Sequence, residues 1–337
     1  MVSMKDIARE CQVSIATVSK ALNGYGDIGE ATRKKVREAA DRLGYFPNSS
    51  ARALKTKRTN NLGVLFEEEA NSGLTHDFFN HVLQGFKVTA EQSGYDITFT
   101  SELISTKKMT YLEHCMYRGL DGVVIACVNF YEPAVQELIR SDVPVVTIDH
   151  VFDNRIAVVS DNVKGMKDLT EYVIGCGHTR IAMLHGLDSS VTRARVSSFY
   201  RTMEEHRIKV NPQYVRECAY RDHATAQQLT HELMALPVPP TCILYSDDYS
   251  CLGGYKYLQD HGYEIGKDIS VAGYDGIALA QMLSPSLCTI HQDADQMGAV
   301  AAKSLISLIE NPMATIIEKI SVSGNLQEGA SVAQLNT

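Results

Sequence analysis

The sequence contains no tryptophan, and no run of 18 consecutive apolar residues occurs in its 337 residues. Without such a run the chain offers no candidate for a membrane-spanning helix. The opening segment, MVSMKDIAREC, also lacks the apolar stretch that a secretory signal peptide needs. These absences predict a cytoplasmic protein with no membrane partner. The hydrophobic content of 45% is that of an ordinary globular chain.

The eight cysteines show no spacing typical of a disulfide framework or a structural zinc site. No two of them form a C-x-x-C pair, and several fall inside apolar runs that resemble buried strands. Because the cytoplasm keeps thiols reduced, we expect buried thiols and no disulfide bonds.

The motifs of nucleotide-dependent and hydrolytic enzymes are missing or out of context. The chain has no P-loop and no G-x-S-x-G sequence. GYGDIG at 24–29 has the spacing G-x-G-x-x-G, but the dinucleotide fingerprint must follow a strand, and here a predicted helix precedes it. GCGHTR at 175–180 is typical of a helix end that leads into a strand. The sequence therefore predicts no enzyme activity, no catalytic residue, no cofactor and no metal site.

Two short helices are predicted at the start of the chain. Ser3 and Asp6 match the Ser-x-x-acid capping box, and Ser14 caps a second helix after a tight turn. A third amphipathic helix is expected from about residue 30 to residue 43. Their shared core would contain Ile7, Ala8, Cys11, Val18, Ala21, Leu22, Val36, Ala40 and Leu43.

The outward face of the second helix carries Ile15, Ala16 and Lys20, which span about 140° at 100° per residue. A helix exposed in this way fits the DNA major groove, with its N-terminal residues against base edges. The alternative is a generic three-helix core with an ordinary surface helix.

Residues 44–58, GYFPNSSARALKTKR, predict a basic tether after the third helix. Pro47 cannot continue that helix, and Asn48 or Ser49 can cap a short one that runs through Leu54. A helix this short is unstable alone in water, so we expect it to order only on a partner. An apolar Leu54 among cations suits insertion into a minor groove, whereas the alternative is a plain interdomain linker.

Charge divides the chain at the same place. Residues 1–60 contain 12 basic and 6 acidic side chains, whereas the remaining residues contain 20 basic and 34 acidic ones. A basic head on an acidic body gives phosphate affinity at one end and repels DNA elsewhere.

The segments KDIA, VSIATVSKALNG, ATRKKV, LGYFPNSSARALKTKRTNNLGVLF and SVAGYDG resemble the lactose repressor (LacI/GalR) family of bacterial transcription regulators. The resemblance covers essentially the whole chain and implies DNA contacts of three kinds. The base-reading positions are Ile15, Ala16 and Lys20, the phosphate contacts are Ser14, Thr17 and Ser19, and the tether contacts are Asn48, Leu54 and Lys55.

Two positions depart from the family pattern. Lys20 stands where many members carry arginine, and a lysine cannot form the forked pair of hydrogen bonds that discriminates guanine. Gly29 stands where the third helix usually has a serine cap, a change that costs little because glycine is tolerated there.

Beyond residue 60, short apolar runs alternate with segments of helical period. This alternation predicts parallel sheets covered by helices on both faces. The strand candidates are 62–66, 95–100, 122–126, 143–149, 156–161, 180–185, 241–246 and 269–274. The helical segments are near 77–93, 107–118, 131–141, 162–176, 193–207, 224–236, 248–261 and 293–310.

The predicted fold is therefore an all-α helix-turn-helix headpiece joined to an α/β core. The headpiece spans 1–46, the hinge helix and linker 47–60, and the effector-binding core 61–337. The family resemblance implies two doubly wound parallel-sheet lobes of the periplasmic-binding-protein type, with chain crossings near 161, 289 and 321. The first lobe then holds about 61–160 and 290–320, and the second holds about 161–289 and 321–337.

Ligands of open α/β sheets bind outside the carboxyl ends of the strands, and two such edges would face each other across a cleft. Those ends carry many carboxylates, which suits a polyhydroxylated neutral ligand. The resemblance implies that Phe78, Phe79, Arg195 and Asp275 contact the effector, and more weakly Asp149 and Asp247. For Asp149 and Asp247 the alternative is a helix N-cap at a strand–helix turn. Tyr220 is a further candidate for the pocket.

These observations predict a sequence-specific transcription regulator, in most cases of this family a repressor released from DNA by a small molecule. The expected partners are a near-palindromic double-stranded operator, a small-molecule effector of the sugar class, and a second copy of the chain in a homodimer. A corepressor-type member, whose DNA binding a ligand or partner protein strengthens, is a second possibility. The complete headpiece and the absent export signal disfavour a solute-binding receptor, and the lack of a nucleophile–base set disfavours an α/β enzyme.

Overall fold

The fold is described from a computed structural model in which residues 2–46, 58–67, 73–104 and 107–335 are described. The chain divides into two compact units, Met1–Thr59 and Asn60–Thr337. No helix among the described residues is long and apolar enough to cross a membrane.

The smaller unit is a three-helix headpiece. Its helices are α1 (Met4–Cys11), α2 (Ile15–Leu22) and α3 (Glu30–Leu43). The Asp6 carboxylate accepts hydrogen bonds from the backbone N–H and the hydroxyl of Ser3, at 3.0 and 2.7 Å, which is the predicted capping box. Ser14 accepts from the N–H of Thr17 at 3.0 Å and caps α2. No side chain caps α3, which begins after Gly29.

The core of the headpiece matches the apolar pattern of the sequence. Leu22 and Leu43 are only partly buried but pack against the same cluster. Gly44, at a φ of 66°, ends α3 in the left-handed conformation that glycine adopts without strain. The buried members are Ile7, Ala8, Cys11, Val18, Ala21, Val36, Ala39 and Ala40.

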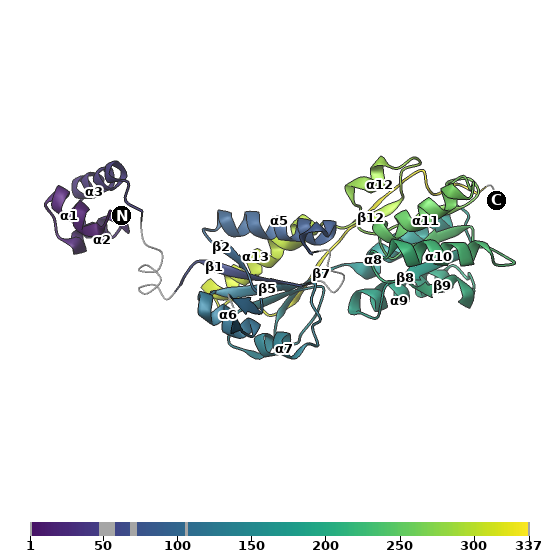
Figure 1. Ribbon diagram of the computed structural model, residues 1–337, viewed down its shortest axis with the longest axis horizontal. Coiled ribbons are helices and arrows are strands. Elements are labelled where there is room, and N and C mark those ends of the chain that lie inside the picture. The colour runs from purple at the N-terminus through teal and green to yellow at the C-terminus, as the bar shows by residue number, and fades with distance from the viewer. Residues whose placement is uncertain (1, 47–57, 68–72, 105–106, 336–337) are drawn as a thin grey trace. The chain divides into compact units, whose positions relative to one another are not determined.

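The larger unit contains two α/β lobes (Figure 1). The first has a six-stranded sheet in the order β13-β7-β6-β5-β1-β2, and every neighbouring pair is parallel. Helices α5 and α13 cover one face and α6 and α7 the other (Figure 1). Its strands are β1 (Asn61–Phe66), β2 (Asp96–Phe99), β5 (Gly122–Ala126), β6 (Val145–Ile148), β7 (Ile156–Ser160) and β13 (Lys319–Val322). Its helices are α5 (Asp77–Gln92), α6 (Tyr111–Arg118), α7 (Pro133–Arg140) and α13 (Ala294–Glu310), with the turn η1 (Gly73–Thr75) and the hairpin β3 (Leu103–Ile104) and β4 (Lys107–Lys108).

The second lobe has a four-stranded parallel sheet in the order β11-β10-β8-β9. Its strands are β8 (Ile181–His185), β9 (Val215–Glu217), β10 (Cys242–Leu244) and β11 (Ser270–Ala272), and an antiparallel pair is formed by β12 (Thr289–His291) and β14 (Asn325–Gln327). Its helices are α8 (Asn162–Gly175), α9 (Ser190–Glu205), α10 (His223–Met234), α11 (Asp248–Asp260) and α12 (Ala278–Met282), with the turn η2 (Pro212–Tyr214). The predicted fold class, a helix-turn-helix headpiece on a two-lobed α/β core, is confirmed.

The chain passes between the lobes three times, after β7, after β12 and after β13. The sequence predicts the second and third crossings near 289 and 321. The second lies slightly later because Thr289–His291 pairs with β14 in the second lobe. The third also lies later because Lys319–Val322 pairs with β7 in the first lobe. Neither β12, β13 nor β14 stood out in the sequence, because each is short and only partly apolar.

Two glycines allow α5 and α13 to pack closely. A Cβ atom at Gly85 would lie 1.9 Å from the carbonyl oxygen of Asp295, and one at Gly298 would lie 1.9 Å from that of Val82. Both obstacles are backbone atoms, so neither can move aside as a side chain can. This close contact fixes the relative position of α5 and α13. Their N-terminal residues, Asp77 and Ala294, lie at the helix ends directed toward the second lobe.

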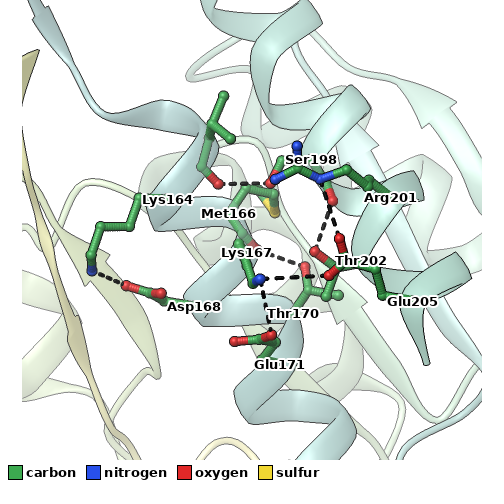
Figure 2. Close-up of polar contacts among 11 residues, drawn as sticks. Lys164, Met166, Lys167, Asp168, Thr170, Glu171, Ser198, Arg201, Thr202 and Glu205 are labelled. Carbon is green, nitrogen blue, oxygen red and sulfur yellow. Dashed lines mark hydrogen bonds and ion pairs between the residues drawn. The ribbon is translucent and has the colours of Figure 1, made fainter.

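A serine hydroxyl and an ion pair link helices α8 and α9 (Figure 2). Ser198 donates to the carbonyl oxygen of Val163 at 2.7 Å and links the two helices directly. Lys167 of α8 reaches Glu205 of α9 at 3.5 Å (Figure 2). This pair of helices carries Asn162 and Arg195, so its packing sets the relative position of two polar groups at the lobe junction.

No disulfide joins any of the eight cysteines, and all but Cys127 are buried. The expectation of buried thiols is therefore confirmed for seven positions, whereas Cys127 is partly exposed at the end of β5.

Candidate functional site

The outward face of α2 presents polar and small side chains around one exposed apolar residue. Ile15 is 44% exposed, Ala16 and Lys20 are also exposed, and Val18 between them is fully buried. Lys20 forms an ion pair with Asp27 in the loop before α3. Ser14 is exposed, and its hydroxyl lies 2.8 Å from that of Thr17. This face can donate and accept hydrogen bonds without disturbing the headpiece core.

Three candidate DNA contacts, Asn48, Leu54 and Lys55, lie outside the described residues. GYGDIG at 24–29 lies between α2 and α3 and contains no strand, in agreement with its interpretation as a loop. Ser19 is partly buried, and its carbonyl oxygen accepts from the side chain of Asn23 at 2.7 Å.

In the larger unit, Arg195 is the cation around which the polar groups at the lobe junction gather. Its side chain is 95% buried on α9, and its Nε donates to Oδ1 of Asn162 at 2.7 Å. Nη1 donates to the carbonyl oxygen of Ser246 at 2.9 Å. The guanidinium carbon lies 3.5 Å from the centre of the Tyr274 ring, a cation–π arrangement. These contacts with Asn162, Ser246 and Tyr274 fix the orientation of the guanidinium group.

Asp275 faces this cation from the loop after β11. Its backbone has a φ of 118°, which an aspartate adopts only when the surrounding contacts hold it there. Burial raises the pKa of Asp275 well above its usual value, Arg195 lowers it in part, and Asp247 and Asp248 raise it further. Gln292 donates to its Oδ1 at 2.7 Å.

Asp248 holds the loop that carries Asp275. Its carboxylate accepts from the N–H groups of Gly276 and Ile277 at 2.8 and 2.9 Å and from the hydroxyl of Thr289 at 2.7 Å. Burial raises the pKa of Asp248 to about 7, although these hydrogen bonds oppose the shift. Asp248 is a positioning residue that fixes the strained turn.

Asp149 approaches from the end of β6 in the first lobe. Its Oδ1 accepts the N–H of Ser160 at 2.9 Å, and its carbonyl oxygen accepts the hydroxyl of Ser190 from the second lobe at 3.0 Å. Burial raises the pKa of Asp149 to about 6, against the hydrogen bond from Ser160 and the charge of Arg195. No helix starts after Asp149, so the interpretation as a helix cap is wrong for this residue.

Asp247, by contrast, is a helix cap. Its carboxylate accepts four hydrogen bonds, two from the backbone N–H and hydroxyl of Ser250 at 2.8 and 2.7 Å, one from the hydroxyl of Ser246 and one from the N–H of Arg221. With its acceptor positions occupied inside the protein, Asp247 acts chiefly as the N-terminal cap of α11.

Phe78 and Phe79 lie at the start of α5, and the structure places them differently. Phe78 is 8% exposed and belongs to the core of the first lobe, whereas Phe79 is partly buried and packs against Phe66 at 5.5 Å. Phe78 also lines a cavity of about 130 Å³ together with Asp275 and His291. A second cavity, of about 160 Å³, is lined by Asp149, Asn162, Ser190 and Ala194 among others.

Five further polar residues take part in this site but were not selected from the sequence. Asn162 directly follows Asp161, and Gln292 directly follows His291, so both lie at lobe crossings. This position is the one sequence signal that points to them. Tyr274 ends an apolar strand and resembles a core residue. Tyr220 stood only as a loose candidate, and its hydroxyl lies 2.9 Å from that of Thr192. The additional residues are Asn162, Thr192, Asp248, Tyr274 and Gln292.

In the described part of the chain, hydrogen bonds join the two lobes. Tyr249 donates to Asp77 at 3.1 Å on one side, and Ser190 donates to the carbonyl oxygen of Asp149 at 3.0 Å on the other. Arg221 lies over the Tyr249 ring at 4.1 Å. Within the described part of the chain, no group of three or more histidine, cysteine, aspartate or glutamate side chains is placed to hold a metal ion.

A small helix-turn-helix unit with an exposed second helix, followed by two parallel-sheet lobes with a polar junction, defines a ligand-responsive DNA-binding regulator. The comparisons with known proteins agree. Residues 3–48 match the family model described as bacterial regulatory proteins, lacI family. Residues 170–332 match the model of a periplasmic binding protein-like domain. The chain belongs to the LacI family of bacterial transcription regulators.

Its relatives extend over nearly the full length. It is 31% identical to the HTH-type transcriptional repressor PurR of Vibrio parahaemolyticus over 92% of this chain and 93% of that protein. It is 30% identical to the ribose operon repressor of Haemophilus influenzae over 93% of each. The structure of a lac repressor dimer bound to operator and the anti-inducer ONPF superimposes with a TM-score of 0.82, covering 98% of this chain and 99% of that one at 24% identity.

Proposed function

We propose that this protein is a repressor that binds a near-palindromic operator as a homodimer and leaves it when a sugar occupies the cleft between the lobes. The observation that carries the proposal is the preorganised Arg195, which is held by Asn162 and Ser246 and faces Asp275 and Asp149. A cation with carboxylates on both sides offers donors and acceptors to paired hydroxyl groups. The ribose operon repressor among the relatives supports the sugar class.

On the DNA side, the proposed base contacts are Ile15, Ala16 and Lys20, with Ser14, Thr17 and Ser19 at phosphates. The Lys20–Asp27 ion pair has to open for Lys20 to reach a base, which adds a cost to DNA binding. Asn48, Leu54 and Lys55 remain proposed contacts of the hinge. The base edges are read in the major groove, so the exposed Ile15 is the contact whose loss should change sequence preference most.

On the effector side, the proposed contacts are Arg195, Asp275, Asp149 and the aromatic pair Phe78 and Phe79. For Asp247 we propose no effector contact. It caps α11, and its hydrogen bonds from Ser246 and Arg221 hold these two residues in place. We further propose that the protein acts in the cytoplasm, because its operator DNA is there.

The DNA half of the proposal is tested by selecting binding sites from a random DNA pool. Wild type should enrich a near-palindromic sequence. Ile15→Ala should retain DNA binding with altered preference at one position in each half-site, whereas exposed Tyr117→Ala on α6 should enrich the same sequence as wild type. Enrichment of no sequence over random DNA would refute the proposal.

The effector half is tested by thermal shift against a panel of sugars and purines, followed by operator titration with each hit. A ligand that binds the folded protein alone raises its melting temperature by mass action. Release from DNA supports the proposal, and tighter DNA binding with the same ligand would assign the corepressor mode instead.

A further inference from the structure

The end of the first lobe's sheet carries an aromatic cluster that the site described above does not use. Phe130 follows β5, and His150 and Phe152 follow β6. The rings of Phe130 and His150 are stacked, with centres 4.3 Å apart and planes 14° from parallel. Phe152 lies 4.7 Å from His150, and the ring of Tyr131 meets His150 edge-on at 5.9 Å. We call Phe130, Tyr131, His150 and Phe152 the aromatic ledge.

One side of the ledge packs on the core of the first lobe, and the other side is exposed. Phe130 and Phe152 pack against the core of the first lobe, whereas Tyr131 is 75% exposed. The backbone is fixed, because Gln136 donates to the carbonyl oxygen of Phe130 at 2.6 Å and Thr147 donates to that of His150 at 2.5 Å. A large aromatic side chain exposed on so rigid a loop is not needed for the core.

The ledge adjoins the effector site through the loop after β6, where Asp149 and Val151 line the cavity and His150 and Phe152 belong to the ledge. Asp149 directs its carboxylate inward to Ser160, and the next residue, His150, belongs to the ledge. The second lobe lies opposite: Ser190 bonds to the carbonyl oxygen of Asp149, and the charge of Arg193 lowers the pKa of His150 beyond the larger effect of burial. Arg193 is paired with Asp188 at 2.7 Å, which adds polar groups to this side of the cleft.

We propose that the aromatic ledge is an outer subsite that stacks on a second sugar ring, so that the effector is a disaccharide or longer oligosaccharide. This inference rests on the proposed sugar effector. One ring occupies the polar inner site, and the next ring places its C–H face on the exposed ring of Tyr131, which lies edge-on to the Phe130–His150 stack. Aromatic faces contact the apolar side of a pyranose ring, while Asp188 and Arg193 can meet its hydroxyl groups.

The test is isothermal titration calorimetry of the full-length protein with matched pairs: glucose with cellobiose and maltose, galactose with lactose, and xylose with xylobiose. At least one disaccharide should bind more tightly than its own monosaccharide. Tyr131→Ala should weaken that disaccharide about 2- to 12-fold, the size expected of one aromatic stacking contact, and leave the monosaccharide unchanged. Tyr131→Phe should bind the disaccharide like wild type.

Tyr117→Ala is the matched control, since Tyr117 is 63% exposed on α6 and outside the ledge. It should leave both affinities unchanged. Equal loss of monosaccharide and disaccharide affinity in Tyr131→Ala, or monosaccharide binding that no disaccharide improves, would overturn the outer subsite while the sugar effector stands. If no sugar of the panel binds, the outer subsite and the sugar effector both fail, and a purine hit in the thermal-shift panel would redirect the effector class.

Discussion

Replacing Arg195 with methionine removes the buried cation that faces both Asp275 and Asp149. Methionine keeps much of the aliphatic volume of the arginine stem against Tyr274. The change leaves Oδ1 of Asn162 and the carbonyl oxygen of Ser246 without their donors. It also leaves Asp275 among Asp247 and Asp248 without an opposing charge. Breaking one side of such a buried charge arrangement costs about 3–5 kcal/mol.

The predicted result at pH 7.5 is a loss of about 3–5 kcal/mol in the free energy of unfolding, measured by urea titration of the fluorescence or circular dichroism signal. Arg193→Met, two residues along the same helix, is the matched control. The side chain of Arg193 is 58% exposed and pairs with the exposed Asp188, so its loss should change stability by less than about 1 kcal/mol.

A double-mutant cycle with Asp275→Asn separates the charge from the packing. If Asp275 is the destabilised partner, Asp275→Asn should recover about 1–3 kcal/mol in the Arg195→Met background. The defect of Arg195→Met should also shrink as the pH falls, because the unpaired Asp275, whose pKa burial already raises well above its usual value, can take up a proton and lose its charge. Additive single effects, or an Arg195→Met variant as stable as wild type, would refute the charge argument.

Three further predictions follow from individual contacts. Gly298→Ala should destabilise the protein by about 1–3 kcal/mol, because its Cβ would meet the carbonyl oxygen of Val82. Gly175→Ala, where the added Cβ has open space around it, should not destabilise it. Thermal melting of both variants checks this. Lys167→Ala should lower stability by no more than about 1 kcal/mol in a urea titration, because its ion pairs to Glu171 and Glu205 are partly solvated. For Asp149, the folded pKa of about 6 lies above the unfolded value near 3.8, so its contribution to stability declines by about 3 kcal/mol as pH rises from 4 to above 6. Asp149→Asn keeps the bond from Ser160 and should flatten that part of the melting temperature–pH curve; an unchanged curve contradicts the assigned pKa.

The sequence predicted most elements of the fold because their physical signals are local. The Ser3–Asp6 capping box and the Ser14 cap define the headpiece helices within a few residues. The sequence predicts β5 and β7 directly, because each is a short apolar run that is buried on both faces of the sheet. Strand β13 was missed because it alternates exposed and partly buried residues at the sheet edge and takes its partner from about 160 residues earlier.

The site was only partly predictable for the same reason. Arg195 and Asp275 were found through motif resemblance, yet Asn162 and Tyr274 become visible only when α8 and β11 are brought against α9. The two interpretations of Asp149 and Asp247 were equivalent in sequence, because both residues follow a strand. Their difference depends on what comes next: a helix starts at Asp248, whereas a loop with a turn follows Asp149.

The most direct test of the account measures operator affinity with and without a saturating cleft ligand, in wild type and in Arg195→Met, by fluorescence anisotropy. The account predicts a change of about 5- to 150-fold in wild type, the usual size of allosteric coupling. It predicts no ligand effect in Arg195→Met, with ligand-free operator binding preserved at a temperature where that variant is folded. A ligand that demonstrably occupies the cleft of wild type and leaves operator affinity unchanged would contradict the account.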